Sequence, residues 1–154
     1  MNIFDELGKI YNEIDNKYVT ILVQARSLKH NKKEAEYYRK RLLNDQAYFL
    51  FMFTRLEGRI REISDNIISD KTAKTKDWKT KWAWEVIQKQ KSDDKLHFMN
   101  RVALLTPKGQ TDYNLIKQYY DQRNEIGHGG DFTIIISIPT VIADMKRLYS
   151  DLIR

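Results

Sequence analysis

Hydrophobic residues recur every three or four positions along most of the chain, the spacing that brings side chains to one face of an α-helix. The first such stripe extends over residues 3–28 and the second over residues 42–67, with the turn predicted at Lys29–Lys33. The pattern therefore predicts two long antiparallel helices. The two stripes consist of Ile3, Leu7, Ile10, Ile14, Tyr18, Ile21 and Leu28, and of Leu42, Phe49, Phe53, Leu56, Ile60, Ile63 and Ile67.

Within the second predicted helix, residues 48–53 (YFLFMF) are hydrophobic on every side. A helix with this pattern must be covered from more than one direction. It is either a central helix of the core or a helix with one side packed on another subunit, because a monomer seldom exposes such a patch. Both interpretations are open at the level of the sequence.

Shorter helices are predicted in the rest of the chain. Ser92 is placed to cap a short helix, and Thr111 begins a longer helix that ends near His128, where glycines cluster. The last helix is predicted to begin at Ser137. The β-branched run before it predicts a short extended segment at Phe132–Ser137.

The composition is that of a folded, helix-rich protein. Of the 154 residues, 42% are hydrophobic, and the chain contains Gly 6 times and Pro 2 times. This length suits one domain. We therefore expect a single all-α domain over residues 1–154, an antiparallel bundle of four to six helices with the extended segment before the last one.

Several classes of site and location are disfavoured. The chain has no cysteine, and its three histidines (His30, His97 and His128) lack the spacing of metal ligands, so we expect neither a metal nor a cofactor. The longest hydrophobic run, Ala47–Phe53, is far shorter than the ~20 residues of a membrane span. The acidic N-terminus does not resemble a signal peptide, so we expect a cytoplasmic protein without a membrane partner.

The positive charge is concentrated in residues 71–95, which hold eight lysines and four acidic residues, a net of +4 within the total of +6. Trp78, Trp82 and Val86 are spaced to share one helix face, so we expect at least one tryptophan to be buried. Lysines interleaved with aromatic residues can contact RNA. A solvated lysine-rich helix explains the pattern equally well. The candidate RNA-binding residues are Lys76, Lys79, Lys81 and Trp84.

Arg123 and His128 lie where the helix that begins at Thr111 runs out. The stripe of Tyr113, Ile116 and Tyr120 continues to Arg123, which predicts this arginine on the apolar face. A buried guanidinium needs a partner, and we expect Glu57 of the second helix to provide it. Histidine is suited to moving a proton at neutral pH. Arginine and histidine are also common in the last turn of a helix, where they satisfy free carbonyl groups.

The run Arg123, Asn124, Glu125, Ile126, Gly127, His128 resembles the Arg-x4-6-His signature of the HEPN superfamily. The resemblance implies a small all-α domain, a metal-independent endoribonuclease and a homodimer in which two motifs meet in one cleft. Such proteins are toxins or virus-defence effectors, which implies RNA as substrate and an antitoxin or other regulatory protein as partner.

The resemblance also implies roles for single residues. Arg123, Asn124 and His128 match the catalytic positions of the motif, and Glu57 matches a supporting acidic residue only by its place in the second helix. Some toxins of the superfamily carry a regulatory tyrosine two positions after the histidine. This chain has Gly130 there, so that form of regulation is not implied.

Two other hypotheses are open. The chain could be a non-catalytic HEPN-like helical module that binds RNA, a nucleotide or a protein partner, with Arg123 and His128 only closing a helix. A helical DNA-binding protein is a third hypothesis, although no convincing recognition helix is present.

Overall fold

The computed structural model describes residues 3–152, and within them the chain is all-helical, with six helices, 82% helix and no strand. The predicted all-α class is therefore confirmed. The helices are α1 (Ile3–Ser27), α2 (Asn31–Lys74), α3 (Trp78–Ser92), α4 (Phe98–Leu105), α5 (Thr111–Gly127) and α6 (Ile138–Asp151). No helix in the described residues is long and apolar enough to cross a membrane.

The chain divides into two compact units. Unit 1 comprises Met1–Thr54 and Gln122–Arg147, and unit 2 comprises Arg55–Asp121 and Leu148–Arg154. Helices α2, α5 and α6 therefore each contribute residues to both units. The single domain predicted over residues 1–154 stays a prediction.

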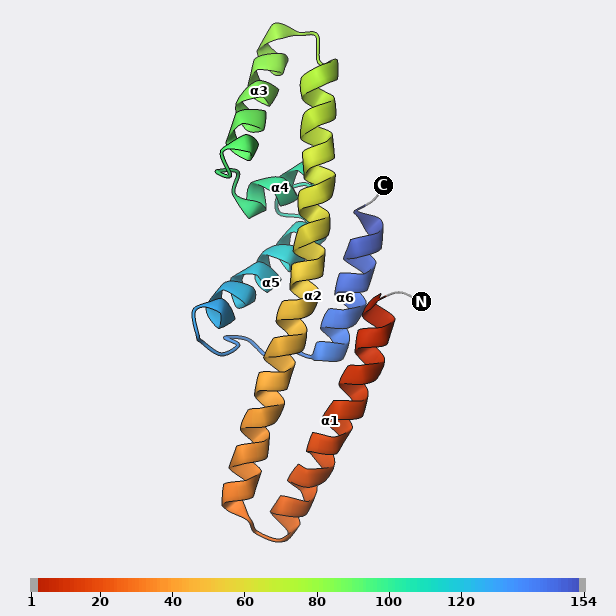
Figure 1. The fold of residues 1–154 in the computed structure, drawn as a ribbon, viewed down its shortest axis with the longest axis vertical. Helices are drawn as coiled ribbons and strands as arrows, with labels where there is room; N and C mark the ends of the chain where they lie inside the picture. The colour runs from red at the N-terminus through yellow and green to blue at the C-terminus, as the bar shows by residue number, and fades with distance from the viewer. Residues whose placement is uncertain (1–2, 153–154) are drawn as a thin grey trace. The chain divides into compact units, whose positions relative to one another are not determined.

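Unit 1 is built on a hairpin of α1 and the first part of α2, which run antiparallel as predicted (Figure 1). The turn includes Lys29, whose φ of 54° is left-handed. Polar contacts join the two helices along their length. Tyr11 donates a hydrogen bond to Asp45 (2.9 Å), and Arg41 holds both carboxylate oxygens of Asp15. The hairpin is thus fixed by specific pairs as well as by its apolar contacts.

The core-facing stripe of α1 differs from the predicted one. Ile3, Ile10 and Leu28 are exposed, whereas Phe4 and Tyr11 are buried. The chain has adjacent pairs of hydrophobic residues at these places, and burial of the larger aromatic ring removes more apolar surface from water. The buried residues of α1 are Phe4, Tyr11, Leu22 and Ala25.

The other predicted stripes hold better. Phe49, Phe53, Leu56 and Ile60 of α2 are all fully buried, and the buried stripe then continues through Ser64 and Ile68. The four predicted residues of α6, Ile138, Val141, Met145 and Leu148, are buried, and so is Leu152, which directly follows the helix. Within unit 1, α6 packs on α1. A Cβ added to Gly8 of α1 would lie 3.7 Å from the side chain of Ile142 of α6. Lys146 of α6 also forms an ion pair with Asp5 of α1.

Unit 2 contains the second part of α2 together with α3, α4 and most of α5. Arg101 of α4 is buried and binds Ser64 (3.0 Å) and Asp65 of α2. The predicted Ser92 cap is wrong, because His97 caps α4 by accepting a hydrogen bond from Met99 N. Ser92 instead belongs to α3, where its hydroxyl donates to the carbonyl of Gln88.

The three tryptophans of α3 are less buried than predicted. Trp78 and Trp82 are exposed and Trp84 is half-buried, and no residue of α3 is fully buried. The side of α3 that carries Trp84 lies toward α2, where the hydroxyl of Thr72 donates to the Trp84 carbonyl (3.5 Å). Helix α3 thus rests on α2 with few buried side chains.

Candidate functional site

The Arg123–His128 motif lies at the C-terminal end of α5. Helix α5 ends at Gly127, as predicted from the glycines. The amide of Gly129 donates to the Ile126 carbonyl (2.9 Å), the amide of Gly130 donates to the Glu125 carbonyl (2.9 Å), and Gly129 has a φ of 86°. This pattern is a Schellman cap, in which a left-handed glycine ends the helix and satisfies its last carbonyl groups.

Both glycines after His128 have a local structural reason. The left-handed conformation of Gly129 disfavours any residue with a Cβ. A Cβ on Gly130 would come within 3.0 Å of the Glu125 carbonyl oxygen. The sequence GHGG therefore encodes a complete helix end, and His128 occupies the position where the helix stops.

Arg123 is exposed, so its predicted position on the apolar face of α5 is wrong. The buried stripe of this part of α5 is Ile116, Tyr119 and Gln122. The buried stripe is shifted around the helix by about one residue relative to the predicted stripe. Gln122, and not Arg123, therefore faces inward. The Arg123 guanidinium donates a hydrogen bond to the Asn124 side chain (3.1 Å). Two of the three predicted catalytic residues are therefore in direct contact.

Gln122 is 4% exposed and holds the loop that follows the motif. Its amide nitrogen donates to the Thr133 hydroxyl (2.6 Å), and its amide oxygen accepts from the Thr133 backbone N–H (2.8 Å). A buried amide is tolerated because both of its ends are satisfied. The apolar pattern did not predict a role for Gln122; the available signal was its position three residues after Tyr119 on the buried side of the helix.

Asp131 ties the same loop to the first part of α2. Its carboxylate accepts two hydrogen bonds from Arg39 (2.9 and 3.1 Å) and one from Gln46 (2.8 Å). These donors, Arg39 first, hold the pKa of Asp131 below its ordinary value. The Phe132 ring packs edge-on against Phe49 (5.4 Å between centroids). The loop after His128 is therefore anchored at Asp131, Phe132 and Thr133.

No strand forms in the described residues where the short extended segment was predicted. Residues 132–137 are irregular, with a bend at residues 133 and 134. Ile135 is fully exposed, whereas Ile134 and Ile136 are half-buried. The start of the last helix is as predicted, because α6 begins at Ile138, directly after Ser137.

The His128 side chain is exposed on the anchored helix end. No hydrogen bond or ion pair involves its imidazole within residues 3–152. The imidazole is therefore accessible from solvent. Arg123 and half-buried Asn124 precede it in the last turns of α5, so the three predicted residues share one helix end.

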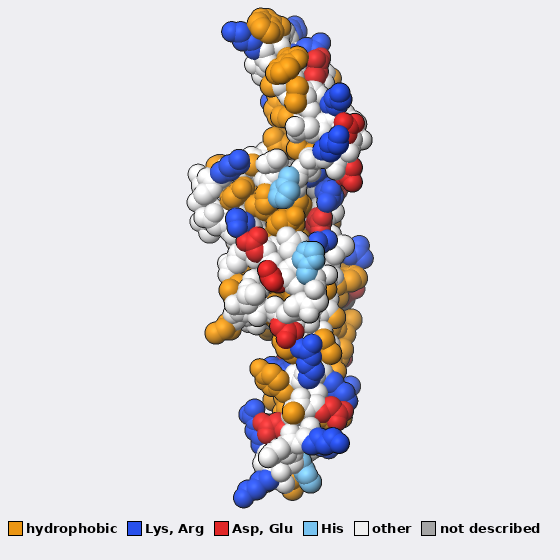
Figure 2. Space-filling model, turned by 90° about the vertical axis from the view of Figure 1, so that its left-hand side faces the viewer, with side chains coloured by type: hydrophobic (Ala, Val, Ile, Leu, Met, Phe, Trp, Pro, Cys, Tyr) orange, Lys and Arg blue, Asp and Glu red, His pale blue; other side chains and the backbone are white. Residues whose placement is uncertain are grey.

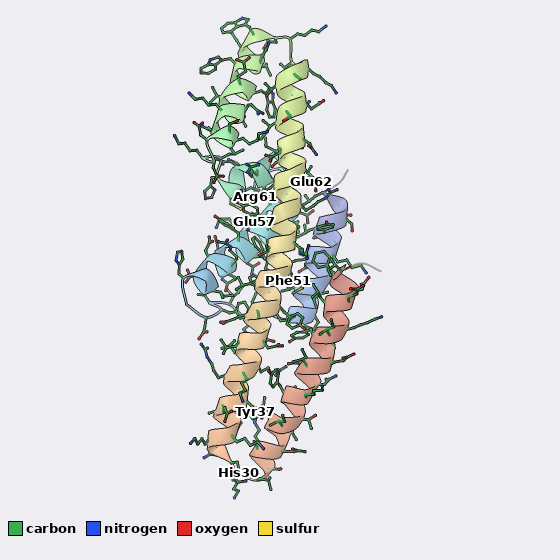
Figure 3. All side chains as sticks on the ribbon, viewed as in Figure 1. His30, Tyr37, Phe51, Glu57, Arg61 and Glu62 are labelled. Atoms are coloured by element: carbon green, nitrogen blue, oxygen red, sulfur yellow. The ribbon has the colours of Figure 1, made fainter. Side chains whose placement is uncertain are left out.

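Glu57, the predicted supporting residue, belongs to unit 2. Its carboxylate accepts two hydrogen bonds from Arg61, one turn further along α2 (2.8 and 3.2 Å; Figure 3). Arg61 is thus one cation that neutralises it. The predicted pairing of Glu57 with Arg123 stays a prediction.

The candidate RNA-binding residues lie in unit 2, around the start of α3. Lys76, Lys79 and Lys81 are exposed, in keeping with contact to a polyanion. Trp84 is half-buried, and Trp78 and Trp82 offer more ring surface to solvent. Groups of three or more potential metal ligands do not occur among residues 3–152.

The chain was compared with protein-family models, with curated proteins and with solved structures, and none of them matched. The resemblance to the HEPN superfamily therefore rests on residues 123–128 and on the helical class of the fold.

Proposed function

We propose that the protein is a metal-independent endoribonuclease of the HEPN type, acting in the cytoplasm as a toxin or virus-defence effector. The observation that carries the proposal is the end of α5, where Arg123, Asn124 and His128 lie on an accessible and anchored surface. The contacts of Gln122 and Asp131 hold the following loop and so favour a fixed position for His128. A catalytic base must be held in place to act efficiently.

The residue types suit cleavage of RNA through its own 2′-hydroxyl. His128 would take the proton of the 2′-OH as its oxygen attacks the adjacent phosphorus, and the bond to the 5′-oxygen breaks to leave a 2′,3′-cyclic phosphate. Arg123, with Asn124 beside it, would stabilise the negative charge that builds on the phosphate oxygens. The departing 5′-oxygen takes a proton from an acid. DNA lacks the 2′-OH and should not be cut.

A homodimer would supply that acid, because a second His128 in protonated form could donate to the leaving oxygen. Support for a second copy comes from α2 in unit 1. Phe51 is 44% exposed and lines a groove of about 240 Å³ with Leu7, Ala47 and Tyr48 (Figure 3). Apolar surface of this kind favours burial against another protein surface. An antitoxin or other regulatory protein is the further partner that a toxin would require.

The test is incubation of the purified protein with total cellular RNA in EDTA. Wild type should cleave the RNA and leave 2′,3′-cyclic phosphate ends. His128→Ala should lower the rate by about 10²–10⁴-fold, the usual contribution of a general base. Arg123→Ala should lower it as well, and circular dichroism should show unchanged helix content, because both side chains are exposed.

The matched control is His30→Ala, which removes an exposed histidine at the turn between α1 and α2. It should cleave at the wild-type rate. Equal cleavage by wild type and His128→Ala would contradict the proposal, and so would cleavage that requires a divalent metal. Cleavage of an oligonucleotide with 2′-deoxyribose at every position would exclude the 2′-OH mechanism.

A specific observation favours a second candidate, the non-catalytic helical module. The Schellman cap accounts for Gly129 and Gly130 without any catalytic role. Under this alternative, Arg123 and His128 serve the helix end, and the protein binds RNA, a nucleotide or a protein. His128→Ala would then leave the biological activity intact.

A further inference from the structure

Two tryptophans on one face of α3 are exposed to solvent. Trp78 is 72% exposed and Trp82 is 65% exposed. They are four residues apart, so their side chains are neighbours on the helix surface. Trp84 is half-buried and its carbonyl accepts from Thr72 of α2, whereas the indoles of Trp78 and Trp82 lie mostly in solvent.

The exposed surface of these indoles is considerable. A tryptophan that becomes buried removes about 150–250 Å² from water, so the pair leaves on the order of 300 Å² of aromatic surface available. The largest apolar patch on a typical monomer is about 300–600 Å² and is often functional, so a patch of this size is a candidate binding site. The patch can be followed in Figure 2, where hydrophobic side chains lie at the end of unit 2 that carries the α2–α3 turn, bordered by lysine and arginine.

Three lysines without an ion-pair partner among the described residues lie close to the two rings in the sequence. Lys76, Lys79 and Lys81 are exposed, and within residues 3–152 none of the three has an acidic partner. The Lys79 ammonium lies 5.6 Å from the centre of the Trp78 ring. Asp77, next to Lys76 in the sequence, is the N-cap of α3 and accepts hydrogen bonds from the backbone and hydroxyl of Thr80, so its carboxylate is directed at the helix end.

We propose that Trp78 and Trp82, with Lys76, Lys79 and Lys81, form a binding site for single-stranded RNA. The indoles stack on unpaired bases, and the lysines contact the phosphates that flank those bases. The preference for RNA over single-stranded DNA rests on the proposed function. The stacking and charge contacts themselves rest only on the exposed face of α3.

The spacing of the rings fits this occupant. Side chains four residues apart on a helix have Cβ atoms about 5–6 Å apart, and the bases of a stacked strand lie about 3.4 Å apart. Two indoles at such a separation can enclose one base or continue a short stack. Duplex RNA does not offer unpaired faces, so the site should prefer single strands.

A membrane surface is the less fitting occupant. Helices that lie in a lipid interface have a broad apolar face along their length. Among the large hydrophobic residues of α3, only Trp78, Trp82 and Val86 are exposed, and the exposed Glu85 lies beside Val86. The exposed apolar face is therefore narrow, and charged residues of both signs border it, which suits a nucleic acid strand better than a lipid interface.

The test uses the full chain with His128→Ala, so that bound RNA is not cut. Fluorescence anisotropy of a labelled 12-nucleotide single-stranded RNA gives the affinity, and quenching of tryptophan fluorescence reports stacking. In this background, Trp78→Ala with Trp82→Ala should weaken binding at least tenfold. The same two positions changed to Phe should keep most of the affinity, whereas Leu should lose it, because only Phe retains an aromatic face.

The lysines are tested by the dependence of affinity on salt. Replacing Lys76, Lys79 and Lys81 by Gln should lower the slope of log K against log salt concentration by about two, since each phosphate contact on a single strand contributes about 0.7. Two control variants carry matched changes in unit 1. They are Tyr38→Ala, which removes another exposed aromatic ring, and Lys29, Lys32 and Lys33 changed together to Gln. Both should bind RNA as the parent chain does.

Three results would overturn this site. The first is unchanged RNA affinity when both tryptophans are replaced by Ala or by Leu. The second is tryptophan-dependent binding to phosphatidylserine vesicles without binding to RNA. The third is a tryptophan-dependent shift in sedimentation that shows self-association in place of RNA binding.

Failure of this site and failure of the proposed function can be told apart. A chain with intact His128 that carries Trp78→Ala and Trp82→Ala reports cleavage in EDTA independently of the binding assay. If the tryptophan substitutions leave RNA affinity unchanged while cleavage still depends on His128, only the proposed site on α3 is refuted. If RNA affinity depends on the tryptophans but RNA cleavage does not depend on His128, only the proposed nuclease activity is refuted.

Discussion

The ion pair between Arg101 and Asp65 should respond very differently to loss of either partner. The Arg101 side chain is 5% exposed and binds Ser64 as well as Asp65, while the Asp65 side chain is 43% exposed. Asp65→Ala leaves a guanidinium buried without a counter-charge. Removing one partner of a buried pair costs about 3–5 kcal/mol. Because water can reach the place of Asp65, we expect the lower end, about 3 kcal/mol.

Arg101→Met should cost much less. The half-exposed Asp65 carboxylate can be hydrated when the arginine is gone, and methionine fills most of the volume of the arginine stem. The change also removes the Arg101 Nε, which is buried without a hydrogen-bond partner among the described residues. Such an orphan group costs roughly 1–3 kcal/mol. The net loss should be about 1 kcal/mol or less.

Urea denaturation and thermal melts followed by circular dichroism would measure both variants. A loss of about 3 kcal/mol corresponds to a fall in Tm of roughly 6–12 °C for a chain of this size. Asp121→Ala is the control, since it breaks an exposed ion pair with Lys117 in α5 and should change the stability little. If Arg101→Met were at least as destabilising as Asp65→Ala, the argument from unequal burial would be refuted.

Three further outcomes follow from the described contacts. Gly129→Ala should lower the free energy of unfolding by about 1–2 kcal/mol, because Gly129 has a left-handed φ. Gly127→Ala should raise the free energy of unfolding by roughly 0.4–1 kcal/mol, because a Cβ at this position meets open space. Urea denaturation would measure both changes. Gln122→Leu should cost about 1–3 kcal/mol for two lost hydrogen bonds and should speed hydrogen exchange at the Thr133 amide. Burial raises the pKa of Asp45 above the ordinary aspartate pKa of 3.8. The folded state therefore binds this proton more tightly than the unfolded state does, and it loses stability as the pH rises above 3.8. Asp45→Asn should therefore be more stable than wild type at pH 7, by a margin that shrinks as the pH falls in melts at several pH values.

The ends of α5 and the start of α6 could be predicted because their signals are local. Gly129 and Gly130 form the cap of α5 through contacts within six residues, and Ser137 directly precedes α6. Such signals depend on backbone conformation and not on what packs nearby. The end of α5 and the start of α6 were therefore visible in the sequence.

The rotation of α5 could not be predicted, because it depends on a distant partner. A count of apolar residues placed Arg123 on the inner face, whereas the buried residue is Gln122. Its burial is possible only because Thr133, eleven residues later in the chain, satisfies the amide. The clamp on Asp131 from Arg39 and Gln46 is equally non-local and had no sequence signal. The motif residues were named from a pattern, but their surroundings came from tertiary contacts.

The make-up of unit 1 bears on how the protein folds while it is being synthesised. Unit 1 joins Met1–Thr54 to Gln122–Arg147, so residues 55–121, about 67 residues, separate its two parts. At the usual rate of translation of 5–20 residues per second, the second part begins to emerge roughly 3–13 s after the first. The α1–α2 hairpin can form early from neighbouring residues. Until α6 emerges, the hairpin surface around Gly8 that Ile142 later covers stays open to solvent, and exposed apolar surface of this kind favours aggregation of a nascent chain.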